Sequence, residues 1–494
     1  MIFRKISILA AALVLTASLA RVLRAQDEIE HLSPFANGAG RTYAITSRGL
    51  DAVGLNPSLL ALGTPRPFEI TLAPISSLGL NAGPSLSQIN SISQGLQASG
   101  LSSTDTTTNG LTKGDSTRES IANLLSNNNL SSTIDARIFG MSYSNPTFGA
   151  VALTWTMHAA LRASIPSGLL DYIGVGALAR LGQGDSLLPQ QPNVQGIWYS
   201  EYTLSYARTI LGTPGSGEDQ LLAGIGVKYL AGIAAIQMDP SSEFFVNYPR
   251  STIARGGEHS VGVNYRVYSA YPNLFNFTHL PSSFSTSLIT NATAGTGFGA
   301  DLGLTWGTYD STGNSPWQVA LSVTDIGSIR WDQNASVRQV DTIIAASNSQ
   351  GNKDTLNAQL KALGGTLDTT IGSFTTALPT TLHLAGALDL SAIGLSLGSS
   401  KLEAAAEFAL GLTNTVGSPN HGRFGLAVLF EQPGNFAFHT ALGFTTQDGI
   451  TDLTAALGFG IANRILVDAG TSGLTALFSR TGHTDAVFGL KVLL

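Results

Sequence analysis

The 494-residue chain contains no cysteine, few charged residues and, after residue 26, no long hydrophobic run. Without cysteine there are no disulfides, zinc ribbons, iron–sulfur ligands or lipid-anchored N-terminal cysteine. Charged residues make up only 12% of the chain, about half their share in soluble globular proteins. Transmembrane helices need about 20 apolar residues in a row, and this sequence offers none. The Lys and Arg residues form no basic run, so we expect no nucleic-acid binding.

The N-terminus has the pattern of a secretory signal peptide. Arg4 and Lys5 form a basic start, and an apolar stretch of 15 residues follows from Ile6 to Ala20. Cleavage is plausible after Ala20 or after Ala25. The alternative is a membrane anchor helix, but the apolar stretch is shorter than the roughly 20 residues that span a bilayer. We therefore expect residues 1–25 to be a signal peptide and the protein to be exported.

Stretches in which apolar residues alternate with small or polar ones recur along the rest of the chain. This alternation is typical of transmembrane β-strands. A soluble β-sandwich or propeller also alternates, but its polar side would carry more Lys and Glu than the Gly, Ala, Ser and Thr found here. The most regular stretches are 259–267, 298–306, 402–410 and 453–461; similar ones are 198–206, 221–229, 317–323, 382–390, 424–430, 436–444 and 486–494, and weaker ones 68–72, 134–143, 148–157 and 465–469.

The strand pattern predicts an all-β fold, a single closed antiparallel transmembrane β-barrel in the cell outer membrane. We expect about 14 strands, within a range of about 12 to 16. Two polar regions, 83–132 and 334–378, are expected to be long insertions between strands, each with a short helix, at 115–125 and 354–363. Aromatic residues near strand ends, such as Trp306 and Trp317, fit an interfacial girdle, although ordinary packing in sheets explains them nearly as well.

Residues 37–59 (NGAGRTYAITSRGLDAVGLNPSL) resemble the opening of FadL-like outer-membrane barrels. That group includes long-chain fatty acid transporters and PorV-type proteins, and shorter stretches at 136–143, 148–149, 297–303 and 323–331 resemble an uncharacterised branch of it. The resemblance implies a 14-strand barrel at 63–494, with residues 26–62 entering its lumen as a plug. The matching positions are Gly38, Gly40, Asp51, Asn56 and Pro57.

Isolated charges fall on the side of the strands that alternation turns inward. A charge on the lipid face near the bilayer centre costs about 2–4 kcal/mol for Arg or Lys, so these residues are predicted to face the lumen. There they either form a structural ion-pair network or line a polar path and tune its selectivity. The predicted lumen-facing residues are Glu201, Lys228, Glu258, Arg266, Asp301, Asp389, Glu403, Glu407, Arg423 and Lys491.

The chain offers little that points to enzyme chemistry. Pro57 restricts Asn56 to extended backbone, so the pair is interpreted as a turn rather than a ligand contact. Residues 394–398 match G-x-S-x-G, but they lie in a hairpin and not in the required strand–elbow–helix context. Glu403 and Glu407 lie about 13 Å apart on a strand, too far apart for glycosidase chemistry. The eight histidines lack metal-ligand spacing, so we expect neither metal nor cofactor.

Three functions remain open at this point. The leading hypothesis is a non-enzymatic barrel that passes or binds a small hydrophobic solute and contacts outer-membrane lipid. The alternative is a PorV-type scaffold whose partners are secretion-system or envelope proteins. The remote third is an outer-membrane hydrolase that uses Ser396.

Overall fold

The computed structural model describes a set of segments that together cover most of the chain after residue 31. These are residues 32–63, 66–72, 78–82, 130–164, 187–247, 259–270, 293–346, 368–395, 400–419, 422–447, 450–477 and 484–494. The predicted signal peptide, both predicted helices in the insertions and most of the insertion at 83–132 lie outside the described residues.

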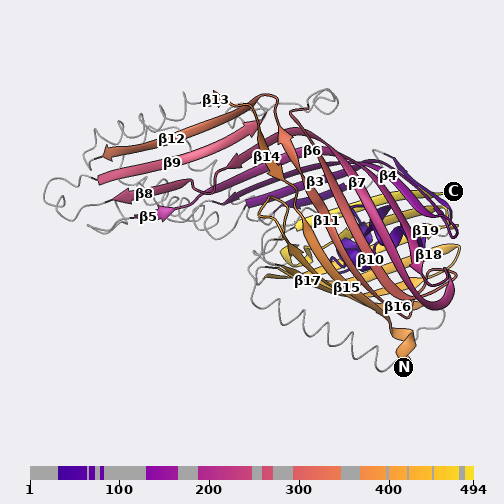
Figure 1. Ribbon diagram of the computed structural model, residues 1–494. Helices are drawn as coiled ribbons and strands as arrows, with labels where there is room; N and C mark the ends of the chain where they lie inside the picture. Colours follow the sequence, from indigo (N-terminus) through magenta and orange to yellow (C-terminus); the bar gives the residue numbers. More distant parts are fainter. Residues whose placement is uncertain are drawn as a thin grey trace.

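Fourteen strands close into one antiparallel barrel (Figure 1), which confirms the predicted fold class. The last strand pairs with both parts of the first, so the wall has no open edge. A closed wall satisfies the backbone groups that lipid cannot. In order, the strands are β1 (Phe68–Leu72) with β2 (Leu78–Ala82), β3 (Leu130–Asn145), β4 (Gly149–Ser164), β6 (Asn193–Leu211), β7 (Ser216–Met238), β10 (Gly295–Asp310), β11 (Trp317–Trp331), β15 (Thr381–Asp389), β16 (Lys401–Gly411), β17 (Arg423–Gln432), β18 (Phe436–Gln447), β19 (Ile450–Ile461), β20 (Ile465–Thr471) and β21 (Thr484–Leu493).

A second group of strands projects beyond the barrel wall (Figure 1). We call it the extension: β5 (Leu187–Gln190), β8 (Glu243–Asn247), β9 (His259–Ala270), β12 (Ala335–Ala346) and β13 (Asp368–Thr370). β9 pairs with β12, with β8 and, at 267–270, with the end of β7. The alternating stretch 259–267 is therefore a strand, but it belongs to the extension. Part of the predicted insertion 334–378 forms β12, β13 and β14 (Phe374–Ala377), and β14 pairs with β11.

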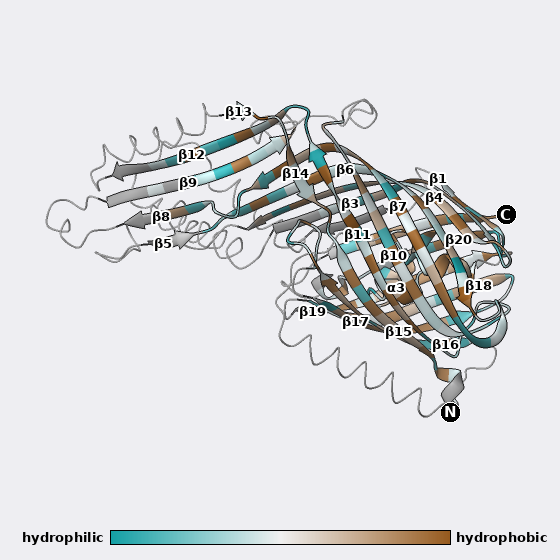
Figure 2. Cartoon of the chain, in the orientation of Figure 1, coloured by the Kyte–Doolittle hydropathy of each residue, from teal (hydrophilic) through white to brown (hydrophobic). Residues whose placement is uncertain are grey.

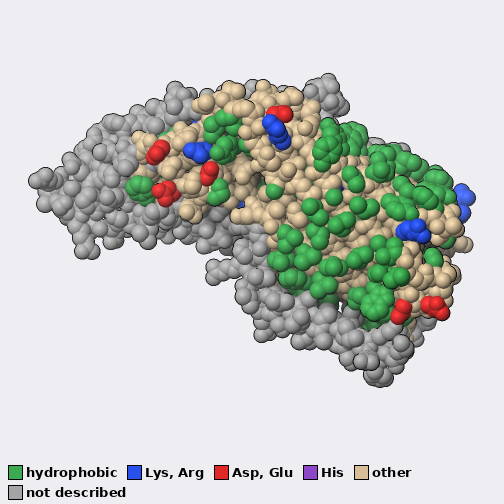
Figure 3. All heavy atoms as spheres, viewed as in Figure 1, with side chains coloured by type: hydrophobic (Ala, Val, Ile, Leu, Met, Phe, Trp, Pro, Cys, Tyr) green, Lys and Arg blue, Asp and Glu red, His purple; other side chains and the backbone are tan. Residues whose placement is uncertain are grey.

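The two faces of the barrel wall differ in polarity, as the alternation predicts. Along β10, exposed Leu302, Leu304 and Trp306 alternate with buried residues such as Asp301 and Thr305. Figure 2 shows the same alternation of hydrophobic and hydrophilic residues along neighbouring strands. In Figure 3 hydrophobic side chains gather over the visible barrel surface, while charged ones lie toward its ends and on the extension. This distribution, apolar outside and polar inside, is that of a transmembrane barrel.

Connections of different length meet at the two ends of the barrel. The short turns at 146–148, 212–215, 433–435 and 462–464 lie at the end that also holds the C-terminal residue Leu494. At this end β15 is followed by the short helix η5 (Leu390–Ile393). The extension and η6 (Leu474–Leu477) belong to the opposite end. We call these the turn end and the extension end.

The N-terminal segment, residues 32–63, is short-helical and almost entirely buried. It contains α2 (Pro34–Gly38), α3 (Tyr43–Thr46), η1 (Gly49–Ala52) and η2 (Pro57–Leu62). α2 packs on β19 and β20, α3 on β11, β15 and β16, and η2 on β6, β7 and β10. Since these strands come from around the wall, the segment is enclosed by the ring of strands (Figure 1).

No helix in the described part of the chain is both long and apolar enough to cross a membrane.

Candidate functional site

The backbone of the N-terminal segment lies directly against the inner wall at two glycines. Gly40 has φ +69°, and a Cβ there would lie 2.7 Å from the Leu426 carbonyl oxygen on β17. Gly38 is packed as closely against the backbone of Ala455 on β19. Only glycine allows such an approach, and at Gly40 it also adopts a conformation that other residues avoid. These two positions therefore join the segment to the wall without intervening side chains.

The Asn56–Pro57 pair holds the segment to the opposite part of the wall. The Asn56 side-chain amide donates to the Ala44 carbonyl (2.8 Å) and to Thr305 Oγ1 on β10 (3.0 Å). Its oxygen accepts from the Ser58 backbone N–H (3.2 Å), which caps η2. Pro57 begins η2, where its missing N–H costs nothing. The pair makes a turn that is also a contact between the segment and β10.

Charged side chains form a first cluster between the segment and β1, β3, β20 and β21. Asp51 accepts from Lys491 (2.6 Å) and from Arg137 (3.3 Å). Lys491 also lies 3.7 Å from Glu69 and 4.0 Å from Asp468. All five side chains are buried. We call this the Asp51 cluster, and it ties the segment to the wall by charge-assisted hydrogen bonds.

A second cluster, the Glu407 cluster, holds α3 to β15, β16 and β17. Glu407 lies 3.0 Å from Arg423 and 2.9 Å from His383. Its other oxygen accepts from the Ala44 backbone N–H (2.7 Å). Arg423 in turn donates to the Arg41 carbonyl (2.6 Å). The buried Glu407 carboxylate thus binds groups of the wall and of the enclosed segment at the same time.

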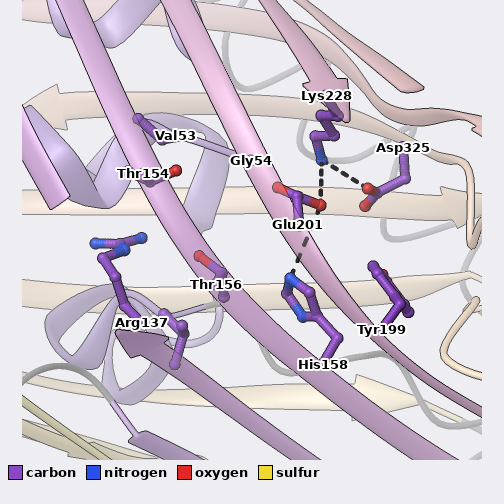
Figure 4. Close-up of a pocket in the computed structure, with 11 residues that line it drawn as sticks. Val53, Gly54, Arg137, Thr154, Thr156, His158, Tyr199, Glu201, Lys228 and Asp325 are labelled. Carbon is purple, nitrogen blue, oxygen red and sulfur yellow. Dashed lines mark hydrogen bonds and ion pairs between the residues drawn. The ribbon is translucent and has the colours of Figure 1, made fainter. Parts of the chain in front are cut away.

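A third cluster lies on the wall alone, at β6, β7, β10 and β11. The Lys228 ammonium lies 2.6 Å from Asp325 and 3.4 Å from Glu201 (Figure 4). It also lies 3.0 Å from Asp301. Asp325 has φ +55°, and its backbone N–H donates to Asp301 (2.8 Å). All four side chains are buried. In this Lys228 cluster one ammonium faces three carboxylates.

His158 on β4 extends the Lys228 cluster toward a small cavity. Its Nδ1 lies 2.5 Å from Asp135, and its Nε2 points toward Glu201 Oε2 at 3.8 Å (Figure 4). The imidazole also stacks on Tyr199, with ring centroids 5.0 Å apart. The cavity lies between the segment and the wall and is lined by Leu32, Val53, Gly54, Arg137, Thr154, Thr156, His158, Tyr199, Glu201, Lys228 and Asp325.

An apolar layer adjoins this cavity toward the extension end. Tyr199 belongs to both, because it also packs with buried hydrophobic residues of β6, β7 and β11. The indole N–H of Trp331 donates to Thr376 Oγ1 (2.9 Å), so this large side chain is buried with its polar atom satisfied. The main residues of the layer are Ile197, Tyr199, Leu230, Ile329, Trp331 and Leu378.

Seven of the ten charges predicted to face the lumen are buried on strands of the wall: Glu201, Lys228, Asp301, Glu403, Glu407, Arg423 and Lys491. Three are placed differently. Arg266 is on β9 of the extension and donates to Gln339 (3.1 Å). Asp389 is the last residue of β15 and caps η5 through the Ser391 N–H (2.8 Å). Glu258 lies outside the described residues.

Several residues of the clusters were not predicted. Asp135 and Arg137 lie in a stretch that had been predicted as a strand, so its alternation would have identified them. Asp325 could not be found in this way, because the pairing of β10 with β11 shifts register at 324–325. Such a bulge breaks the alternation.

The described residues hold no group of three side chains arranged to bind a metal ion. Of the G-x-S-x-G match, Gly394 ends η5 at φ +92°, and Ser396 lies outside the described residues.

The sequence matches the model of DUF5723, described as a family of unknown function, over residues 61–464. The chain belongs to this family. No curated protein is similar enough to the sequence to count as a match.

Several solved structures are similar to this DUF5723 protein, all at low sequence identity. The toluene transporter TbuX of Ralstonia pickettii has 10% identity and a TM-score of 0.39, with 94% of this chain and 99% of that chain covered. A TodX mutant described as a monoaromatic hydrocarbon channel has 9% identity and a TM-score of 0.42, with 94% and 98% covered. A Pseudomonas aeruginosa FadL homologue has 8% identity and a TM-score of 0.39, with 94% and 98% covered. The closed 14-strand antiparallel barrel is itself the fold that the resemblance to FadL-like barrels implies.

Proposed function

We propose that this DUF5723 protein is an outer-membrane barrel that passes or binds a small hydrophobic solute, with residues 32–62 acting as its plug. The observation that carries the proposal is a closed barrel with an apolar outer face whose lumen encloses this segment. A small cavity of about 30 Å³ remains where the segment meets the wall, lined on the segment's side by Leu32, Val53 and Gly54.

The outer surface supports membrane insertion. Large side chains on the outward face are exposed, among them Phe298, Leu302 and Leu442. In a soluble protein so many contiguous exposed hydrophobic residues would cause aggregation. Transmembrane barrels have short periplasmic turns and longer extracellular connections. The turn end would accordingly face the periplasm, and the extension end the outside.

The contacts of the N-terminal segment support its role as a plug. Asp51, the Ala44 N–H and Asn56 each bind a different part of the wall. A segment held on several sides blocks the lumen until some of these contacts open. Solute passage would then depend on how strongly the segment is held.

Uptake of the hydrophobic dye N-phenyl-1-naphthylamine by intact Gram-negative cells tests the proposal, because the outer membrane normally excludes it. Cells that carry the full chain should take up the dye faster than vector controls. Deletion of residues 32–62 should accelerate uptake further. Barrel folding of both proteins is checked first by a heat-dependent shift in gel mobility. Folded protein with uptake equal to the vector control, with and without the segment, would refute transport.

A scaffold in secretion or envelope assembly is the second candidate, and the extension favours it. β9 and β12 pair along 12 residues each and project beyond the wall. A projecting sheet provides surface for a protein partner. Loss of secretion without loss of dye uptake, after removal of the extension, would favour this function over transport.

A further inference from the structure

One arginine of β11 lies on the outward face of the barrel wall. Arg330 is near the end of this strand, and the outward residues before it, Ser328 and Ile326, are exposed as it is. Within the part of the chain that the structure describes, its side chain has no hydrogen bond or ion pair, not even with exposed Asp332 two positions further on. A guanidinium is always charged and offers five N–H donors. On a lipid-facing surface it therefore favours an anionic acceptor.

The place of Arg330 along the wall puts it at the edge of the apolar surface. Arg330 pairs directly with Thr296 on β10, and Trp306 lies ten positions further along that strand. Ten residues span about 33 Å, which at the usual strand tilt of about 40° is about 25 Å across the membrane. The apolar band of a transmembrane barrel is about 25 Å tall. With Trp306 and its contact Trp317 at one interface, Arg330 lies at the head-group level of the other.

Hydroxyl groups flank Arg330 on both neighbouring strands, where the extension leaves the barrel (Figure 1). Its direct partners are Thr296 on β10 and Thr375 on β14, and both are exposed. We call these three residues the Arg330 row. Since paired strands lie about 4.8 Å apart, the row is about 10 Å wide. A phosphate bound to Arg330 is too small to reach both threonines, whereas a phosphorylated sugar carries hydroxyls and acceptors over such a width.

Apolar side chains adjoin the Arg330 row on its membrane side. Phe298, two residues from Thr296 on β10, is 70% exposed, and Ile326 on β11 is 41% exposed. Ser328 lies between them and the row as the direct partner of Phe298. A cation above an apolar surface is the arrangement that suits an anionic lipid, because head group and acyl chain are both contacted.

From this arrangement we propose that the Arg330 row binds the head group of a phosphorylated glycolipid in the outer leaflet. Arg330 donates two hydrogen bonds to a phosphate, since its planar fork matches two phosphate oxygens. Thr296 and Thr375 bond to the sugar, and an acyl chain lies along Phe298. The leaflet follows from the orientation given under the proposed function, with the extension end outside. Solute passage does not depend on this contact, so its failure would leave transport in place.

Competition between two lipids for the full chain tests the proposal. Lipid A is a phosphorylated disaccharide lipid, and phosphatidylglycerol is an anionic lipid without sugar. Both are added at equal concentration to the folded chain in detergent micelles, without divalent cations, and native mass spectrometry separates the bound forms by mass. Each hydrogen bond that only the sugar provides contributes about fivefold in affinity. Lipid A should therefore be bound in at least about fivefold excess.

Substitutions of arginine test whether the Arg330 row is responsible. Arg330→Gln should weaken lipid A binding by about tenfold, because the charged donor is lost. Arg330→Lys should restore only part of it, since an ammonium lacks the planar fork. The matched control is Arg208→Gln. Arg208 is an exposed arginine on the outward face of β6 near the turn end, but its direct partner on β7 is Ala223, which has no hydroxyl; this variant should bind lipid A as the original chain does.

Three results overturn the inference. Equal binding of lipid A and phosphatidylglycerol by the unchanged chain would show that no glycolipid is recognised, and this comparison needs no variant. Folded Arg330→Gln that binds lipid A as tightly as Arg208→Gln does would exclude the Arg330 row. Asp332→Asn should strengthen lipid A binding, because Asp332 repels a phosphate. Weaker binding in that variant would mean that Arg330 serves an ion pair within the chain instead.

Discussion

Replacing Lys228 with Met should destabilise the barrel more than any other single loss of charge in the Lys228 cluster. Lys228 is 1% exposed, and its ammonium lies within 3.4 Å of three buried carboxylates. Without it, Asp301, Asp325 and Glu201 remain buried with no opposite charge in the cluster. Breaking a buried ion pair by removing one partner costs about 3–5 kcal/mol, and we expect a loss of that size in the free energy of unfolding.

The matched control is Lys401→Met on the same barrel. Lys401 lies 2.6 Å from Glu403, but its side chain is 22% exposed. This ammonium faces one carboxylate, not three, and solvent partly screens the pair, so Lys401→Met should lose clearly less free energy of unfolding than Lys228→Met. Adding Asp325→Asn to Lys228→Met should recover part of the loss, because one uncompensated carboxylate is then removed.

Urea unfolding from lipid vesicles, followed by tryptophan fluorescence, measures these free energies. The midpoint and slope are compared for the original chain, the two Lys→Met variants and the double variant. If the two Lys→Met variants lose free energies of unfolding that differ by less than about 1 kcal/mol, the reasoning is refuted. The carboxylates of the Lys228 cluster would then be stabilised by solvent rather than by the lysine.

Three further changes test the contacts of the N-terminal segment and the outer face by the same unfolding measurement. Asp51→Asn should cost about 2–3 kcal/mol and increase proteolysis of the N-terminal segment, because two buried cations lose their shared carboxylate; unchanged proteolysis would contradict the anchoring role. Gly40→Ala should lower the free energy of unfolding more than Gly217→Ala. Both glycines have positive φ, but only at Gly40 would the added Cβ also clash with backbone atoms of the wall; equal losses in the two variants would refute the close contact. Leu302→Arg should cost about 2–4 kcal/mol and Phe436→Arg, beside a turn, about 0–1 kcal/mol; equal and negligible costs would mean that no lipid surrounds the barrel.

Much of the wall could be predicted because each strand carries its own two-faced pattern. Along 298–306, exposed apolar residues alternate with inward ones in the structure as they do in the sequence. The same pattern on 259–267 led to a wrong placement, because a strand of the extension alternates just as a wall strand does. Whether such a strand belongs to the wall or to the extension depends on which strands it pairs with, and the alternation does not contain that information.

The candidate site was predictable only in part. Alternation identified Glu201, Lys228 and Asp301 as inward residues, and the resemblance identified Asp51. Neither alternation nor the resemblance could reveal that Lys228 faces three carboxylates, or that Asp325 completes the cluster at a bulge. Those facts depend on register between strands, and a shift of one residue would exchange the two faces.

The two-faced β wall follows from local properties of the chain, namely the side-chain period of 2 and the scarcity of charge. Which charges meet depends on how the strands pair and close. Asp51 and Lys491 are separated by 440 residues and lie 2.6 Å apart. No local rule can bring such positions together, since their distance follows from closing the barrel around the N-terminal segment.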